Sequence, residues 1–162
     1  MKWPFRKPLI NMSPKANLRH PGSYSKAEDF AGQHRFQEVI DDQQADPAAV
    51  KKVLLCPGKL YFDLEEKRQK ENRTDIALIR LEQIYPTPEE QLIALHEKYS
   101  NAVWFWVQEE PQNMGAATFL QTTFKAFPYG IISRNASAST ATGYAKVQKV
   151  EQEEILDTAF NV

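Results

Sequence analysis

One stretch of the chain decides the fold: Trp104-Phe105-Trp106-Val107-Gln108-Glu109-Glu110-Pro111-Gln112-Asn113-Met114-Gly115-Ala116. In it, a dense apolar strand leads directly into two carboxylates and the start of a helix. In open α/β sheets, ligands and partner chains are met in the crevice beyond the carboxyl ends of the parallel strands. The polar half of this stretch is therefore the first place to look for a functional site.

Strands and helices alternate on both sides of this stretch. Short apolar runs predict four main strands, at 51–56, 75–81, 103–107 and 131–133. Helices are expected at four places, starting near Gly58, at Thr87 as a cap, at Asn113 or its neighbour, and within 144–160. Phe36, Val39 and Ile40 suggest either a short additional strand or an apolar strip laid across the main sheet. This order implies right-handed crossovers and a mostly parallel sheet covered on both faces, so we expect a three-layer α/β/α fold with about five strands.

Length and composition exclude several classes of protein. The 162 residues suit one domain, and a net charge of −1 with both signs mixed gives no reason to expect a nucleic-acid partner. No apolar run approaches the roughly 18 residues that cross a bilayer, and the N-terminus lacks the regions of a signal peptide, so we expect a cytoplasmic protein without a membrane partner. One cysteine excludes an internal disulfide, and three scattered histidines predict no metal site.

The first 50 residues differ in texture from the rest, because five prolines interrupt polar segments there. We expect residues 1–24 to be an interdomain linker that carries a stray strand of a preceding domain at Leu9–Met12, and residues 25–162 to form the domain itself. A short helix is predicted directly after the linker. Ser25 would cap it, with Glu28 three residues on in the reciprocal arrangement that satisfies free backbone donors.

Several motifs occur in an order that resembles one family. They are Pro8-Leu9-Ile10 through Met12-Ser13-Pro14-Lys15, Leu18-Arg19-His20-Pro21, Gly58-Lys59-Leu60-Tyr61, Ile79-Arg80-Leu81-Glu82-Gln83, Gln108-Glu109-Glu110-Pro111 through Gly115-Ala116, Ala136-Ser137-Ala138-Ser139 and Ile155-Leu156-Asp157-Thr158-Ala159-Phe160. With them the chain resembles the C-terminal part of the thiamine-diphosphate-dependent decarboxylating component of 2-oxoglutarate dehydrogenase. The resemblance covers nearly the whole length, is weakest at 41–50, and implies a transketolase-type C-terminal domain.

This resemblance implies one part of an enzyme. In the family, two preceding domains hold thiamine diphosphate and magnesium across a dimer interface through a Gly-Asp-Gly motif, which this sequence lacks. The parent reaction decarboxylates 2-oxoglutarate in the citric acid cycle and passes the succinyl group to a lipoyl arm. We therefore expect no catalytic or cofactor-binding residue here, and an isolated chain that binds no thiamine diphosphate. The implied partners are the preceding domains, a second subunit and the lipoyl-bearing succinyltransferase component.

Five residues form the candidate site: Gln108, Glu109, Glu110, Asn113 and Gly115. The two adjacent acids could be a catalytic pair with different pKa values. Adjacent side chains on an extended segment point in opposite directions, so we favour one carboxylate that holds a neighbouring loop or the dimer partner and one that faces solvent. The resemblance places this loop at the subunit and interdomain contact, which implies a positioning role. The glycine serves a turn or a close backbone approach, or is an ordinary helix-start residue.

Other reactive residue types have a structural explanation beside the functional one. Cys56 lies at a strand end where a helix begins, a setting that lowers a thiol pKa and suits a hydrolase nucleophile. No histidine is adjacent and Pro57 removes a backbone donor, so a buried small residue is the favoured interpretation. His96 is expected to be partly buried and hydrogen-bonded, and His20 to order the linker. Trp104, like its neighbours in the strand, is expected to pack in the core.

The resemblance also raises the possibility of a regulatory ligand. Actinobacterial relatives carry an acetyl-CoA activation site whose positions correspond to Arg35, Glu38, Gln83, Glu90 and Gln91. Arg35 and Gln83 keep the charge and the amide and are the candidate contacts, but Glu90 and Gln91 replace two phosphate-clamping arginines and Glu38 replaces a serine. These losses predict weak or absent acetyl-CoA binding. A stand-alone module that binds an acyl-CoA or a nucleotide is the alternative to an enzyme part.

Overall fold

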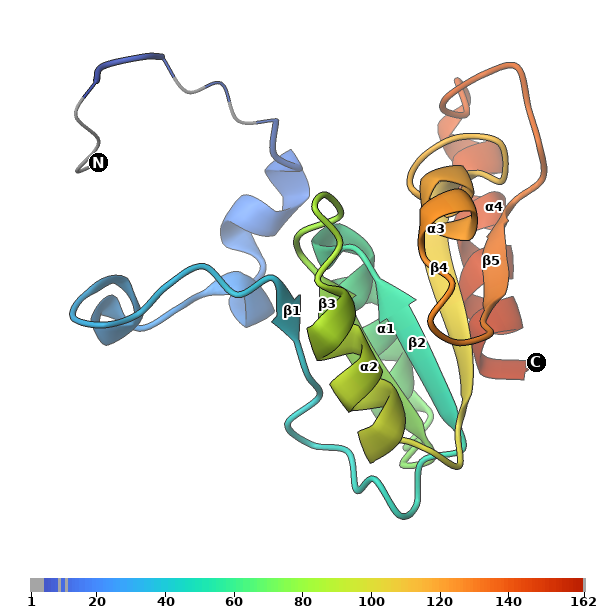
Figure 1. Ribbon diagram of the computed structural model, residues 1–162. Helices are drawn as coiled ribbons and strands as arrows, with labels where there is room; N and C mark the ends of the chain where they lie inside the picture. Colours follow the sequence, from blue (N-terminus) through green and yellow to red (C-terminus); the bar gives the residue numbers. More distant parts are fainter. Residues whose placement is uncertain (1–4, 9, 11, 162) are drawn as a thin grey trace. The chain divides into compact units, whose positions relative to one another are not determined.

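The computed structural model describes residues 5–8, 10 and 12–161 (Figure 1). The chain divides into two compact units, residues 1–34 and 35–162. In the described part of the first unit there are three short 3-10 helices: η1 (Lys15–Arg19), η2 (Pro21–Ser23) and η3 (Ala27–Phe30). The expected division into a linker, 1–24, and a domain, 25–162, stays a prediction.

Two details of the first unit differ from the sequence prediction or fall outside what is described. Leu9 and Asn11 of the predicted stray strand lie outside the described residues, while Ile10 and Met12 belong to no strand and are exposed. The predicted short helix is the 3-10 turn η3. Its cap is Lys26, whose backbone N–H donates to Asp29 Oδ2 at 2.9 Å, so the prediction that Ser25 caps it is wrong by one residue.

The second unit is built on one sheet. In the described residues it has five strands in the order β1-β3-β2-β4-β5, and only β1 runs antiparallel to its neighbour. The strands are β1 (Val39–Ile40), β2 (Lys52–Cys56), β3 (Ile76–Leu81), β4 (Val103–Pro111) and β5 (Gly130–Arg134). Apolar side chains fill β2 and β3 almost continuously, as expected of strands covered on both faces.

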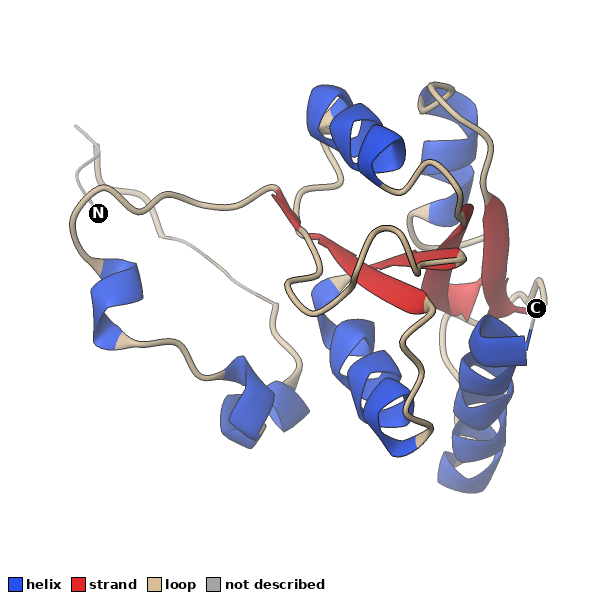
Figure 2. Ribbon diagram, turned by 90° about the horizontal axis from the view of Figure 1, so that it is seen from below, coloured by secondary structure: helices blue, strands red, loops and turns tan. Residues whose placement is uncertain are grey.

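Helices cover both faces of the sheet, which confirms the predicted three-layer α/β/α fold (Figure 2). They are α1 (Gly58–Lys70), α2 (Glu89–Lys98), α3 (Ala117–Thr123) and α4 (Ala145–Asn161). Helices α2 and α3 pack on the face that carries Trp104 and Trp106, while α1 and α4 pack on the face that carries Leu54 and Val107. Each face thus has its own apolar core.

Three element boundaries differ from those predicted. Strand β4 continues to Pro111, four residues beyond its predicted end, and a register shift interrupts its pairing with β5 after Val107. Helix α2 begins at Glu89, because the Thr87 hydroxyl donates to the Ile84 carbonyl at 2.9 Å and caps nothing. Helix α3 begins at Ala117 and is not capped by Asn113.

Charged side chains are buried at the amino edge of the sheet, which is the edge formed by the amino ends of its parallel strands. Asp42 forms an ion pair with Arg68 and accepts the Leu78 backbone N–H at 2.8 Å. The Lys52 ammonium donates to the Ala159 carbonyl at 3.0 Å near the end of α4, and burial lowers the pKa of this lysine. These bonds fasten the start of the sheet to the ends of α1 and α4. The sequence analysis did not anticipate them.

Candidate functional site

The carboxyl edge of the sheet collects polar side chains from four strands. Because β2, β3, β4 and β5 are parallel, the residues that follow them lie along one edge. Glu82 follows β3, and a side chain at Gly58, which begins α1, would lie 2.9 Å from its Oε1 atom. Lys59 comes after β2 and forms an ion pair with Glu109 of β4. The predicted site thus lies on a polar edge that extends well beyond the predicted residues.

Gln108 is the organising residue of the loop between β4 and α3. Its side chain is 0% exposed. The amide oxygen accepts from Trp106 Nε1 at 2.8 Å and from the Ala117 backbone N–H at 2.9 Å. The amide nitrogen donates to the Pro111 carbonyl at 3.0 Å and to the Met114 carbonyl at 2.8 Å. A buried amide satisfied in this way fixes the loop, and its polar atoms are not available to a ligand.

Gly115 is required by the same loop for two reasons. Its φ of +64° is a conformation that other residues rarely adopt. A Cβ atom there would also lie 3.0 Å from Glu110 Cβ and 3.1 Å from the Gln108 amide. Helix α3 begins only at Ala117. The geometry therefore favours the turn and the close approach over an ordinary helix-start glycine.

The two adjacent acids have different surroundings. The register shift between β4 and β5 lies at these residues, and such bulges re-aim side chains at strand ends. Glu109 is half-buried and pairs with Lys59, whereas Glu110 is exposed. This is the arrangement expected when one carboxylate holds a neighbouring segment and the other faces solvent. Only Glu109 is held by a neighbouring segment, so the positioning role stays our prediction for this pair.

Asn113 joins the β4–α3 loop to the segment between β5 and α4. Its Nδ2 atom donates to the Ser137 carbonyl, and its Oδ1 atom accepts from the Ser137 backbone N–H, each at 3.0 Å. This two-bond clamp replaces the helix cap predicted for Asn113. The side chain remains exposed, so it is accessible to a neighbouring domain as well.

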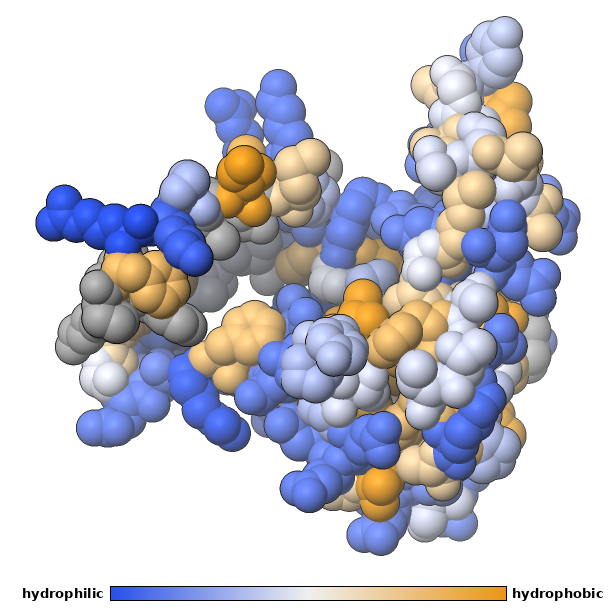
Figure 3. Space-filling model, turned by 45° about the horizontal axis from the view of Figure 1, so that its top comes forward, coloured by the Kyte–Doolittle hydropathy of each residue, from blue (hydrophilic) through white to orange (hydrophobic). Residues whose placement is uncertain are grey.

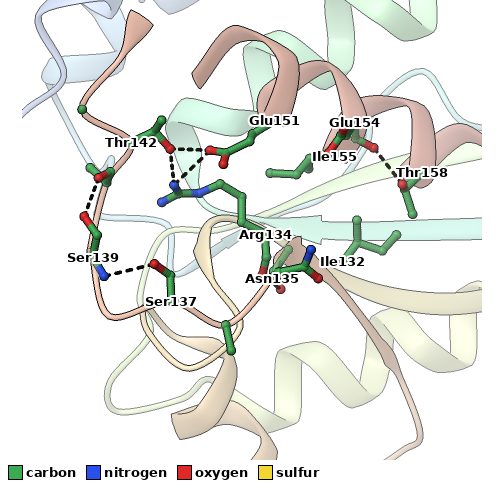
Figure 4. Close-up of a pocket in the computed structure, with 14 residues that line it drawn as sticks. Ile132, Arg134, Asn135, Ser137, Ser139, Thr142, Glu151, Glu154, Ile155 and Thr158 are labelled. Carbon is green, nitrogen blue, oxygen red and sulfur yellow. Dashed lines mark hydrogen bonds and ion pairs between the residues drawn. The ribbon is translucent and has the colours of Figure 1, made fainter. Parts of the chain in front are cut away.

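Arg134, which the sequence analysis missed, connects three segments at the end of β5, and Figure 4 shows its bonds to Thr142 and Glu151. Its Nε atom donates to the Glu109 carbonyl at 2.6 Å and its Nη2 atom to the Thr140 carbonyl at 3.0 Å. Its Nη1 atom donates to Thr142 Oγ1 at 2.7 Å and pairs with Glu151 of α4 at 3.2 Å. The Thr142 hydroxyl and this guanidinium lower the pKa of Glu151. The sequence signal that could have identified Arg134 is its position as a basic residue directly after the predicted strand 131–133.

A hollow of about 600 Å³ lies between the β5–α4 segment and α4 (Figure 4). Hydroxyl and amide side chains such as Asn135, Ser137 and Thr158 line it, together with Glu154. Arg134 and Glu151, which form its charged pair, already bond to each other. The hollow is therefore polar and close to the loops that the Gln108 and Asn113 contacts hold in place.

Comparison with known proteins decides the family. A family model described as 2-oxoglutarate dehydrogenase C-terminal matches residues 24–160. Over 98% of its length, the chain is 40% identical to the 2-oxoglutarate dehydrogenase E1 component of Azotobacter vinelandii. The chain belongs to the 2-oxoglutarate dehydrogenase C-terminal family. The resemblance inferred from its motifs is thereby confirmed.

Relatives in this family differ in the substrate that their names give. The chain is 43% identical, over 93% of its length, to the 2-oxoadipate dehydrogenase complex component E1 of Xenopus laevis. It is 39% identical, over 96% of its length, to the 2-oxoglutarate dehydrogenase E1/E2 component of Corynebacterium glutamicum. The chain spans only 18% of the Azotobacter protein, 17% of the Xenopus protein and 13% of the Corynebacterium protein. Most of each relative therefore lies outside the matched region.

The other reactive residue types prove to be structural in this family member. Cys56 is fully buried, its Sγ atom lies 3.7 Å from the Ile79 carbonyl, and burial raises the pKa of the thiol, which removes the hydrolase interpretation. His96 is half-buried and stacks on Phe127 at 4.2 Å between ring centroids. His20 accepts the Gly22 backbone N–H at 3.1 Å and so orders its turn as predicted.

Two of the positions considered for acetyl-CoA, Glu38 and Gln91, bond to each other, and Gln83 bonds to a backbone carbonyl. Gln91 Nε2 donates to Glu38 Oε2 at 3.3 Å, and Gln83 Nε2 donates to the Pro86 carbonyl at 2.8 Å. A backbone hydrogen bond, the Gln91 amide and the nearby Arg35 charge lower the pKa of Glu38. A carboxylate therefore sits among these residues, and Glu90 is exposed. Weak or absent acetyl-CoA binding stays a prediction.

The described residues form neither a cluster of metal ligands nor a membrane-spanning helix. Among residues 5–8, 10 and 12–161, no three or more His, Cys, Asp or Glu side chains form a group that could hold a metal ion. In the same described part of the chain, no helix is both long and apolar enough to cross a membrane. The polar edge contains paired side chains and contacts between loops.

Proposed function

We propose that this chain is the C-terminal structural and dimer-forming domain of a 2-oxo acid dehydrogenase and that its carboxyl edge shapes one wall of the active-site cleft. The observation that carries this proposal is the buried Gln108 amide, which fixes the β4–α3 loop through Trp106, Ala117, Pro111 and Met114. Family membership supplies the enzyme to which such a loop belongs. A loop held this firmly is suited to positioning its neighbours.

The proposed substrate is a 2-oxo dicarboxylic acid. Relatives named for 2-oxoglutarate and relatives named for 2-oxoadipate match the chain at nearly equal identity, 40% and 43%. The first is our preferred substrate, since four of the relatives are named as 2-oxoglutarate dehydrogenase components and two are named for 2-oxoadipate. The complete protein would then be an oxidoreductase of the citric acid cycle, acting in the cytoplasm.

Thiamine diphosphate and its magnesium ion do not fit the described residues of this chain. The carboxylate best placed at the edge, Glu109, is paired with Lys59, and Glu151 is paired with Arg134. Neither of these acids is free to coordinate the ion that would accompany a diphosphate, and Glu110, which is exposed, belongs to no group of three or more potential metal ligands among the described residues. We therefore assign the cofactor to the preceding part of the enzyme and derive no catalytic step through it from these residues.

The residues of this chain would act on the reaction indirectly. Gln108 and Gly115 hold the β4–α3 loop in one conformation, and Asn113 couples it to Ser137. Glu110 and the exposed face of Asn113 would meet the preceding domains or the second subunit. The lipoyl-bearing succinyltransferase component is the further partner of the complete enzyme. In this account no side chain of the chain exchanges a proton with the substrate.

Calorimetry and activity measurements test the proposal. The isolated 162-residue chain should bind no thiamine diphosphate in the presence of magnesium and should decarboxylate neither 2-oxoglutarate nor 2-oxoadipate. The complete enzyme that contains this region should bind the cofactor and decarboxylate at least one of the two acids. Cofactor binding or turnover by the isolated chain would overturn the proposal, as would a complete protein that acts on neither acid.

A further inference from the structure

Helix α4 has two halves with opposite surroundings. The second half carries Ile155, Ala159 and Phe160, which are buried against the sheet. Residues 143–150, by contrast, are all exposed. This exposed stretch includes the large side chains Val147 and Val150, at 47% and 53% exposure. In Figure 3 the upper right of the molecule is a projection on which apolar patches lie among polar ones.

The first half of α4 packs no face against the other described residues of the domain. Most helical stability in proteins comes from packing of one face, and in the continuous helix Ala145–Asn161 only the second half supplies it. Tyr144, at 79% exposure just before the helix, adds a third large exposed side chain. Nothing among the described residues covers these side chains. Their exposure therefore indicates a surface that another part of the protein contacts.

The apolar stripe continues into the polar hollow beside β5. Val147, Val150 and Glu154 are spaced three and four residues apart, so they share one side of α4. Glu154 also lines the hollow. The stripe, the hollow and the β5–α4 segment are thus one continuous surface, which we call the α4 surface. It adjoins the loop that Asn113 clamps to Ser137.

We propose that the preceding part of the same enzyme chain docks on the α4 surface. This inference rests on the proposed function. The matched region is at most 18% of the relatives compared here, and its family is described as C-terminal, so most of the enzyme would precede it. A covalently joined neighbour binds at high effective concentration and needs little contact area. A separate second copy would need about 800 Å² per partner without the help of a tether, and the large exposed apolar side chains of this surface are only Tyr144, Val147 and Val150.

Hydrogen exchange tests the docking. The complete enzyme and the isolated 162-residue chain are compared under the same conditions. The amides of 145–150 should exchange at least about tenfold more slowly in the complete enzyme, while those of 155–160 should be protected in both. Equal exchange of 145–150 in the two proteins would overturn the inference. Protection in the isolated chain that rises with its concentration would also overturn it, because a second copy would then be the occupant.

Matched variants of the complete enzyme sharpen the test. Val147→Asp/Val150→Asp should abolish the added protection of 145–150, whereas Ala145→Asp/Lys149→Asp, on the other side of the same turns, should keep it. All four side chains are exposed, so both variants should fold. Loss of protection in neither variant or in both would contradict the docking. If the native polypeptide proves no longer than this chain, both the docking and the proposed function fail. If the native polypeptide is longer and the amides of 145–150 stay unprotected in it, only the docking fails.

Discussion

At the amino edge of the sheet, charged groups are buried and bonded within the domain; at the carboxyl edge, polar groups join loops and stay partly accessible. Asp42 and Arg68 are almost fully buried as a pair, and Lys52 reaches the last turn of α4. Arg134 and Asn113 instead connect segments that follow the strands. The same residue types thus stabilise one end of the sheet and arrange loops at the other.

This contrast separates stability from function within one sheet. Substitutions at the amino edge should lower the free energy of unfolding without a specific effect on the enzyme. Substitutions at the carboxyl edge should cost less stability, and their effect should appear in the complete enzyme. The exception is Gln108, which is buried although it lies at the carboxyl edge.

The largest loss of stability is expected for Asp42→Ala. It removes one of the two carboxylates that pair with the buried Arg68, the other being Glu65, and leaves the Leu78 backbone N–H without its acceptor, so the loss should reach up to about 3–5 kcal/mol. Guanidinium unfolding of the isolated chain measures this cost. Glu66→Ala, an exposed acid on the same helix as Arg68, should change stability by less than about 0.5 kcal/mol. A loss for Asp42→Ala as small as that of the control would show that the amino edge is not the stabilising one.

The next largest loss of stability, about 2–4 kcal/mol, is expected for Gln108→Leu. In this variant Trp106 Nε1 and the Ala117 N–H lose their buried acceptor. The substitution keeps the volume of the side chain, so the loss reports hydrogen bonding. Exchange of the Ala117 amide should also accelerate in the folded chain. If stability falls without any local loosening of the β4–α3 loop, Gln108 belongs with the amino-edge residues and the contrast between the edges weakens.

Gly115→Ala should cost about 1–2 kcal/mol, the penalty for a side chain in the left-handed conformation. The close approach to Glu110 and Gln108 adds to this cost. Gly143→Ala is the matched control, since no atom lies within 4 Å of its added Cβ. Thermal unfolding of both variants measures the difference. Equal melting temperatures would show that the loop tolerates a side chain at 115 by shifting.

The smallest expected effect is the pH-dependent stability that Glu151 contributes. The Thr142 hydroxyl and Arg134 lower the pKa of Glu151 below 4.5. A carboxyl group with a lowered folded-state pKa adds stability that is present above its unfolded pKa and is lost as the pH falls through the folded value. Carbon NMR titration should therefore find the Glu151 midpoint below 4.5, and Thr142→Val should move it upward. A midpoint at or above 4.5 in the unsubstituted chain would mean that the Arg134 cluster is not formed in solution.

Much of the fold was predictable because periodicity and strand-end signals are local. The boundaries predicted from the runs 51–56 and 75–81 differ by one residue from those of β2 and β3, and the strand suggested at Val39 and Ile40 is β1. The errors occur where a distant residue decides the outcome. Thr87 bonds to Ile84 instead of capping α2, and Asn113 bonds to Ser137 instead of capping α3. Neither partner is identifiable from the spacing alone.

The candidate site was predicted in part for the same reason. The loop 108–115 was located from its apolar strand and acidic end, and the opposite directions of Glu109 and Glu110 follow from extended backbone geometry. The register shift after Val107 and the ties of Arg134 to Thr140 and Glu151 depend on how β4 and β5 pair. Such pairing is a property of the folded sheet, which the local pattern does not contain.

The most direct test of the account compares one amide from each edge in the complete enzyme. Asn113→Ala should reduce lipoyl-linked turnover several-fold at an unchanged melting temperature, because the loop at the carboxyl edge loses its clamp to Ser137. Gln69→Ala, which removes an exposed amide near the amino edge, should leave turnover unchanged. Equal turnover of both variants and the unsubstituted enzyme would contradict the claim that the carboxyl edge is the functional edge of this domain.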